Sequence, residues 1–146
     1  MASPIYLGNT PMCEHGLGSN GGNPFGPWAG TFGAGQRVSL FQFPLTIKNP
    51  AGGHIYGRVA FSSYTSTPGS VIQGSSVVDG GAQSVWARYY FNNITGAAMW
   101  EQFAYTFWMG PYAAGAHNLD LGVYIAAGTL TFDANGGGTA LAYEIP

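Results

Sequence analysis

The chain has 146 residues, the length of a single domain with a sizeable core, and 46% of them are hydrophobic. Only 7% are charged and the formal net charge is −2, whereas about 25% charged residues is typical. So few charges argue against a basic patch for nucleic acid and against a polybasic or amphipathic membrane-binding segment. No apolar run approaches the ~20 residues needed to span a bilayer.

The low charge content allows two interpretations of the surface. Ser, Thr, Asn, Gln and Gly could make it polar, or other subunits could cover much of it. We favour the second. The single cysteine, Cys13, excludes an internal disulfide framework. The start of the chain has neither a charged nor an apolar signal-peptide region, so we expect a cytosolic chain or one assembled in a cytosol.

Residues 1–36 are rich in glycine and proline and lack a sustained period of 2 or 3.6. This pattern predicts an irregular, extended N-terminal arm that precedes the domain. A solvated linker does not require apolar anchors, yet the arm carries several, which we expect to bind a neighbouring surface: Ile5, Tyr6, Leu7, Met12, Phe25, Trp28 and Phe32. The alternative is an arm folded back on its own domain.

Alternating apolar residues begin near Arg37 and predict a strand over residues 37–49. Phe41, Phe43, Leu45 and Ile47 share one phase, while Val38 and Leu40 occupy the other. Such a phase shift indicates a β-bulge or a strand that changes sheets. Pro44 within the run favours an edge strand or a break between two short strands.

The next predicted strands cover residues 54–66 and 83–93. Between them, residues 66–84 are rich in Ser and Gly and indicate a loop with one short strand near 71–73 or 77–78. Residues 83–93 predict a strand in which Val85, Ala87, Tyr89 and Phe91 share one face. The strand is aromatic on both faces, so we expect a second sheet or another subunit to cover Trp86 and Tyr90.

The last third of the chain, residues 99–146, carries successive alternating runs separated by glycine-rich turns. Each run is predicted to place one apolar face on a core: Phe103, Tyr105, Phe107 and Met109; Leu119, Leu121, Val123 and Ile125; Leu130 and Phe132; Leu141, Tyr143 and Ile145. Together the runs predict an all-β fold, an antiparallel β-sandwich or jelly roll over residues 37–146.

Groups suited to catalysis are few. His117 with Asp120 could contribute to a triad, but no nucleophile-elbow motif is present, and His117 is better explained as a residue that caps a turn. Glu101 and Asp120 could act as a pair of glycosidase carboxylates, although single carboxylates on strands are normally just solvated. We therefore predict no catalytic residues and no enzyme.

Two short motifs have the composition of metal sites. The Cys13-Glu14-His15 run resembles half of a metal site, but zinc needs three or four ligands and the sequence has no second cluster. Residues 133–136 resemble the opening of a calcium loop but lack its later acidic ligands, and a hairpin turn explains them better. We predict no metal and no cofactor.

What remains is an excess of aromatic residues, which are enriched both at protein interfaces and in sugar-binding platforms. Core packing between sheets accounts for some of them. We predict that others form a subunit interface, with these candidates: Trp86, Tyr90, Trp100, Trp108 and Tyr124.

The closing strands carry a recognisable order of residues. Gly115-Ala-His117-Asn-Leu-Asp-Leu is followed by Gly128-Thr-Leu-Thr-Phe and Leu141-Ala-Tyr-Glu-Ile. This order resembles the end of small β-sandwich domains in virion proteins of tailed bacteriophages. Such domains are similar to tumour-necrosis-factor-type jelly rolls and commonly form trimers. The resemblance covers roughly residues 103–145 and implies no catalytic residues.

The resemblance leaves three functions open. The first is a trimeric capsid decoration protein, a structural protein at the capsid surface that stabilises the shell of major capsid protein through its arm. The second is a tail-associated module that binds a receptor or a host surface glycan. The third is a small lectin or glycoside hydrolase. The apolar arm favours the first, and we expect a virion protein assembled in the host cytoplasm.

Overall fold

The computed structural model describes residues 13–17, 30–91, 99–132 and 138–145. Within these ranges the chain forms ten β-strands: β1 (Cys13–Leu17), β2 (Gly30–Gly33), β3 (Arg37–Ile47), β4 (Gly53–Thr65), β5 (Val71–Val78), β6 (Ser84–Tyr90), β7 (Met99–Tyr112), β8 (Gly115–Ala127), β9 (Thr129–Phe132) and β10 (Gly138–Ile145). The described residues include no helix long and apolar enough to cross a membrane. The all-β prediction is confirmed.

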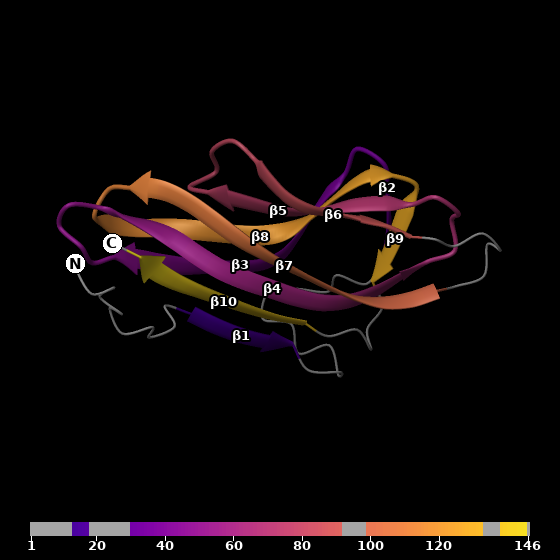
Figure 1. Ribbon diagram of the computed structural model, residues 1–146, viewed down its shortest axis with the longest axis horizontal. Helices are drawn as coiled ribbons and strands as arrows, with labels where there is room; N and C mark the ends of the chain where they lie inside the picture. Colours follow the sequence, from indigo (N-terminus) through magenta and orange to yellow (C-terminus); the bar gives the residue numbers. More distant parts are fainter. Residues whose placement is uncertain (1–12, 18–29, 92–98, 133–137, 146) are drawn as a thin grey trace, which may run out of the picture.

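The strands form two antiparallel sheets that stack face to face (Figure 1). Sheet A has the order β1-β10-β4-β9-β2, and β7 pairs with the side of β4 that faces away from β10. Sheet B has the order β3-β8-β5-β6. Apart from the short β2 and β9, eight strands remain, and they pair as first with last (β1–β10), second with seventh (β3–β8), third with sixth (β4–β7) and fourth with fifth (β5–β6). This nested pairing is that of a jelly roll.

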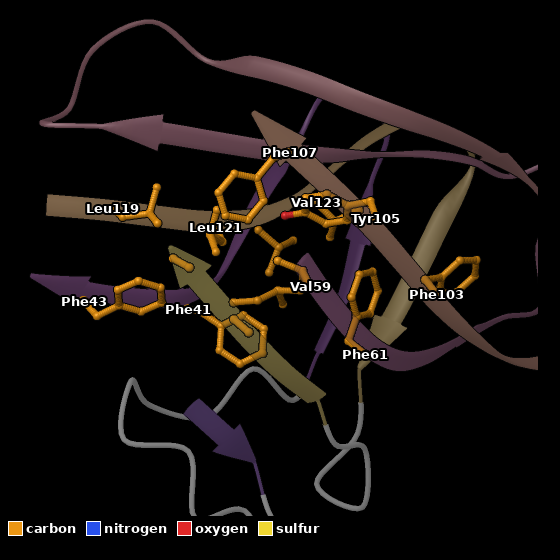
Figure 2. Packing of buried hydrophobic residues seen from close by; sticks show 14 of the residues in the cluster. Phe41, Phe43, Val59, Phe61, Phe103, Tyr105, Phe107, Leu119, Leu121 and Val123 are labelled. Carbon is orange, nitrogen blue, oxygen red and sulfur yellow. The ribbon is translucent and has the colours of Figure 1, made fainter. Parts of the chain in front are cut away.

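The core lies between the two sheets and consists of the alternating residues of the long strands (Figure 2). Phe103, Tyr105 and Phe107 of β7 face Leu119, Leu121 and Val123 of β8, as the sequence predicts. All six side chains are at most 3% exposed. The predicted core faces of residues 103–109, 119–125 and 130–132 are therefore confirmed.

The phase shift in β3 is a β-bulge. The register between β3 and β8 shifts between Ser39 and Phe41. Because of this extra residue, the consecutive side chains of Leu40 and Phe41 are both fully buried. β3 is also an edge strand of sheet B. An edge strand tolerates Pro44, which has no backbone N–H to donate, better than a central strand would. Both expectations for this segment are confirmed.

The segment predicted to be mostly loop contains the whole of β5, an interior strand of sheet B. Its small residues are buried because a large side chain of the opposite sheet requires the space. A Cβ atom at Gly74 would lie 2.6 Å from the ring of Tyr105. The Tyr105 hydroxyl donates to the carbonyls of Ser75 (3.0 Å) and Gly122 (2.8 Å), and burial raises the pKa of this tyrosine.

The predicted phase of residues 83–93 holds from Arg88 to Phe91 and is wrong for Val85 and Trp86, because β6 contains a bulge. The register against β5 shifts between Gln73 and Ser75, which places one extra residue in β6. Trp86 and Tyr89 therefore both pack against the core, while Val85 is 50% exposed. The Trp86 indole N–H donates to the buried Ser76 hydroxyl at 2.7 Å. The second sheet covers Trp86, one of the two expected alternatives.

The predicted core face of β10 is also wrong. Ala140 and Ala142 face the core and are fully buried, whereas Leu141, Tyr143 and Ile145 lie on the opposite face. The reason is space: the rings of Phe41 and Phe107 lie against Gly138 and Gly57, so the layer beneath β10 is already filled by aromatic side chains. Only small residues fit there, and the large residues of β10 point outward.

Part of the predicted arm belongs to the sandwich. β1 pairs with β10 over Cys13–Leu17, and β2 pairs with β9 over Gly30–Gly33. Backbone pairing of this kind leaves no apolar periodicity in so short a segment, which explains why the sequence pattern indicates irregular structure there. In its described parts, residues 1–36 thus include two strands rather than a wholly irregular arm.

Candidate interaction surface

His117 lies between two turns and hydrogen-bonds to both. Its Nδ1 is 2.7 Å from Asp79 Oδ2, and its Nε2 is 2.9 Å from the carbonyl oxygen of Ala113. Both partners accept, so the doubly protonated ring satisfies both contacts. The Asp79 hydrogen bond, and after it the Ala113 carbonyl, raises the pKa of His117. The hydrogen bonds from His117 and the Asn118 amide lower the pKa of Asp79. The predicted capping role is confirmed.

We expect this ion pair to make stability pH-dependent in a defined direction. Because folding raises the pKa of His117, the protonated ring stabilises the fold, fully so below about pH 6.5. This contribution is lost as the pH rises through the raised pKa of His117. The lowered pKa of Asp79 stabilises the fold above about pH 4, and that contribution is lost as the pH falls through it. The free energy of unfolding is therefore expected to fall by up to about 1 kcal/mol between about pH 5.5 and pH 9. Urea denaturation measures this change.

The matched control is His117→Gln, which keeps a hydrogen-bonding side chain and loses the titration. Its free energy of unfolding is expected to change less over the same pH interval. The same change in both proteins would contradict the assignment to this pair.

Asp120 has a partner other than His117. Its Oδ1 accepts from Arg37 Nη2 (2.7 Å) and from the Ser39 hydroxyl (2.8 Å), and its Oδ2 accepts from Gln42 Nε2 (2.9 Å). Positions 117 and 120 have opposite parity on β8, so the two side chains leave opposite faces of the strand. Glu101 lies on β7 in sheet A, whereas Asp120 lies on the outer face of sheet B. The structure brings together neither pair that the sequence suggests, His117 with Asp120 or Glu101 with Asp120.

The metal motifs add no site within the described residues. No group of three or more His, Cys, Asp or Glu residues gathers in that part of the chain. Cys13, Glu14 and His15 are consecutive residues of β1, and residues 133–136 lie outside the described ranges.

Of the predicted arm residues, Phe32 is described by the structure. Its ring packs against Phe132 in its own sandwich, with 6.1 Å between the ring centroids. The others lie outside the described residues: Ile5, Tyr6, Leu7, Met12, Phe25 and Trp28.

The five predicted interface aromatics do not lie together. Trp86 packs on the core, and Tyr90 and Tyr124 lie on the outer face of sheet B, where Tyr90 is 68% exposed. Trp108 lies on the outer face of sheet A and is 52% exposed. Position 100 pairs with Tyr64 in the ladder between β7 and β4.

Around Trp108, large apolar side chains cover the outer face of sheet A. Tyr56 is opposite Trp108 on β7 and opposite Tyr143 on β10, so three aromatic residues form a row across three strands. The centroids of Trp108 and Tyr56 are 6.2 Å apart. Leu141 and Ile145 extend the row along β10 in the same phase. We name this surface the aromatic face: Tyr56, Trp108, Leu141, Tyr143 and Ile145.

The aromatic face carries little charge. Arg58, opposite Leu141, is the charged residue of β4 that shares its phase. Arg58 also lines an open hollow of about 500 Å³. The hollow forms where the short side chains of Ala60, Ala104 and Thr139 project little from the sheet. His54 stacks on Trp108 with centroids 5.4 Å apart, and its Nδ1 is buried with no hydrogen-bond partner among the described residues. The projecting apolar side chains of the aromatic face, next to this hollow, make a surface suited to burial against another protein.

Sequence reasoning identified only Trp108 and position 100 on the strands of this face. It missed Tyr56 and assigned Leu141, Tyr143 and Ile145 to the core. The signal was present in the alternation of β10, which has Ala140 and Ala142 in the other phase. An alternating strand shows two faces, and the sequence does not say which one meets the core.

No protein-family model matches the chain, and no curated protein matches it. Among solved structures, it is similar to the vertex protein P5 of PRD1, with 11% identity, a TM-score of 0.47 and coverage of 95% of this chain and 99% of P5. It is similar to the VP2 subviral particle of infectious bursal disease virus, with 11% identity, a TM-score of 0.47 and coverage of 89% and 32%. It is also similar to the Eiger TNF of S. frugiperda, with 9% identity, a TM-score of 0.45 and coverage of 94% of both chains. The chain spans between 14% and 33% of the length of the first four chains that it matches. The structural neighbours thus include viral coat proteins and a jelly roll of the tumour-necrosis-factor type.

Proposed function

We propose that this chain is a structural virion protein of a tailed bacteriophage, and that it decorates the capsid as a homotrimer. The observation that carries the self-association is the aromatic face. It gathers Tyr56, Trp108 and three large residues of β10 on one side of a chain with only 7% charged residues. The resemblance of the closing strands to phage virion domains supplies the location.

In this proposal three chains pack their aromatic faces around a common axis. Burial of apolar surface stabilises such an interface by about 25 cal/mol per Å². The low charge of the aromatic face favours another copy of the same chain as the partner. Only Arg58 needs an anionic group opposite it. The outer faces of the three B sheets then point away from the axis.

The N-terminal residues bind the shell in this proposal. Ile5, Tyr6, Leu7 and Met12 precede β1 and supply apolar anchors to the major capsid protein. Three linked arms give avidity even where each contact is weak.

Deletion of residues 2–12 tests the shell-binding role and leaves every described strand in place. We expect the truncated protein to remain folded and trimeric by sedimentation. We expect its occupancy on shells assembled without the native protein to fall at least about tenfold, because avidity multiplies the loss of each arm. Electron microscopy of the shells measures the occupancy.

The control replaces residues 2–12 with a Gly/Ser segment of equal length, which keeps the length and removes the anchors. It is expected to behave like the deletion. Undiminished occupancy of either variant would show that the arm does not bind the shell, while a monomeric truncated protein would locate the trimer contacts in the arm.

A further inference from the structure

An open groove of about 440 Å³ lies on the outer face of sheet B, the sheet opposite the aromatic face. Its volume is within the range of about 300–1,000 Å³ that is usual for ligand sites. Three strands and one turn line it: Gln42 and Pro44 of β3, Asn118 and Asp120 of β8, Val77 of β5, and Gly80. The groove lies apart from the aromatic face, and a ligand bound there would be a function in addition to the proposed structural role.

The acidic group of the groove is fixed before any ligand arrives. The Asp120 side chain is 24% exposed and accepts three hydrogen bonds, from Arg37, Ser39 and Gln42. Arg37 is itself held, because its Nε donates to the Ser75 hydroxyl at 2.8 Å. A carboxylate offers about four acceptor sites, so one site on Oδ2, the oxygen that Gln42 contacts, remains for a ligand.

The wall at the turn is also fixed. The Asp79 amide donates to the carbonyl of Asn118 (2.9 Å), and the Asn118 amide donates to Asp79 Oδ1 (2.7 Å). Asp79 and Gly80 have φ values of 51° and 67°, as in the turns that connect tight hairpins. These contacts hold Gly80 beside β8 and keep the groove open.

Two amides of the groove are available for binding. Within the part of the chain that the structure describes, no hydrogen bond engages the side-chain amide of Asn118 or the Oε1 of Gln42, and both residues are exposed. The Pro44 ring is exposed and Val77 is half-buried. The groove thus combines a carboxylate acceptor, two amide groups and an apolar side chain on each side of β8.

Charge decides the class of ligand. Asp120 is the charged residue among those that line the groove, and Arg37 neutralises it at 2.7 Å. A lone compensated carboxylate is a poor cation site, since Ca²⁺ takes six to eight oxygen ligands. An anion would meet the carboxylate at close range. A neutral ligand with several hydroxyl groups suits the donors and acceptors that are present.

We propose that this groove binds a neutral hexopyranose. One hydroxyl donates to Asp120 Oδ2, and neighbouring hydroxyls exchange hydrogen bonds with the amides of Gln42 and Asn118. C–H groups of the ring pack against Pro44 on the β3 side of the groove and against Val77 on the β5 side. Because the carboxylate and the turn are fixed in advance, little ordering is needed on binding. A free sugar and the terminal unit of a glycan share this chemistry.

The test is an amide NMR titration of the full chain with three probes: methyl α-D-glucopyranoside, methyl β-D-galactopyranoside and free glucose. We expect saturable shifts at Val77, Asn118 and Asp120 with a Kd of about 1 mM. Binding of the glycosides but not of glucose would assign the site to glycan-linked sugars, and binding of glucose as well would assign it to free sugar too.

Asn118→Ala and Gln42→Ala each remove one amide from the groove and are expected to weaken binding about tenfold. The matched control is Gln73→Ala, a change on the same outer face outside the groove, which should leave the Kd unchanged. Thermal melting confirms that the variants fold. Three results would overturn the proposal: no saturable shift with any probe, equal shifts with glycerol, or full affinity in both groove variants.

Discussion

Trp108→Glu is expected to convert the proposed trimer into 15.3 kDa monomers. Trp108 is 52% exposed in the single chain, and its ring contacts the rings of Tyr56 and His54. The fold does not require this side chain, so a charge there is tolerated by the monomer. At an interface the same charge is buried without a partner in every copy, at a cost of several kcal/mol each. Sedimentation velocity or light scattering measures the mass.

Tyr90→Glu is the matched control. Tyr90 is 68% exposed, belongs to sheet B, and also carries a cation–π contact from Arg88 at 5.7 Å. Its replacement should leave the trimer intact. Dissociation by Tyr90→Glu with a persistent trimer in Trp108→Glu would move the interface to sheet B. A monomeric unsubstituted protein would contradict self-association altogether.

Gly122→Ala is expected to destabilise the fold by at least about 3 kcal/mol. Gly122 is opposite Ser39 at the bulge of β3, where a Cβ atom would collide with the carbonyl oxygen of Val38. The obstacle is backbone in a paired strand, so it moves only if the β3–β8 ladder moves. The Gly122 carbonyl also accepts the buried Tyr105 hydroxyl at 2.8 Å, a contact that any shift would lengthen.

Urea denaturation measures this effect, with Gly33→Ala as the control. A Cβ atom at Gly33 would meet Gln36 Oε1 at 3.7 Å, an ordinary van der Waals contact. Its free energy of unfolding should stay within about 0.5 kcal/mol of the native value. Equal stability of Gly122→Ala and Gly33→Ala would show that the bulge yields easily.

Local patterns predicted the strands where one face is plainly apolar. In β7 and β8 the alternation of Phe103 to Met109 and of Leu119 to Ile125 gave both the strand and its buried face. In β3 the change of phase at Leu40 indicated a bulge or a change of sheet, and the register shift shows that it is a bulge. These features depend on residues close in sequence.

Features that depend on distant residues were not predictable in this way. Gly74 is small because the ring of Tyr105 fills the space beside it, and the Tyr105 hydroxyl donates to the carbonyl of Ser75, thirty positions away. His117 binds Asp79 rather than Asp120 because the β5–β6 turn lies beside β8. Neither partner is recognisable from its own neighbourhood in the chain.

The sequence by itself determined an all-β sandwich or jelly roll with few charges and too many aromatic residues for an ordinary surface. The tertiary structure decided where those aromatics lie. The rings of Phe41 and Phe107 fill the layer under β10, so its alanines face inward and Leu141, Tyr143 and Ile145 face outward. Volume available between the sheets, which is a property of the packed whole, therefore created the aromatic face.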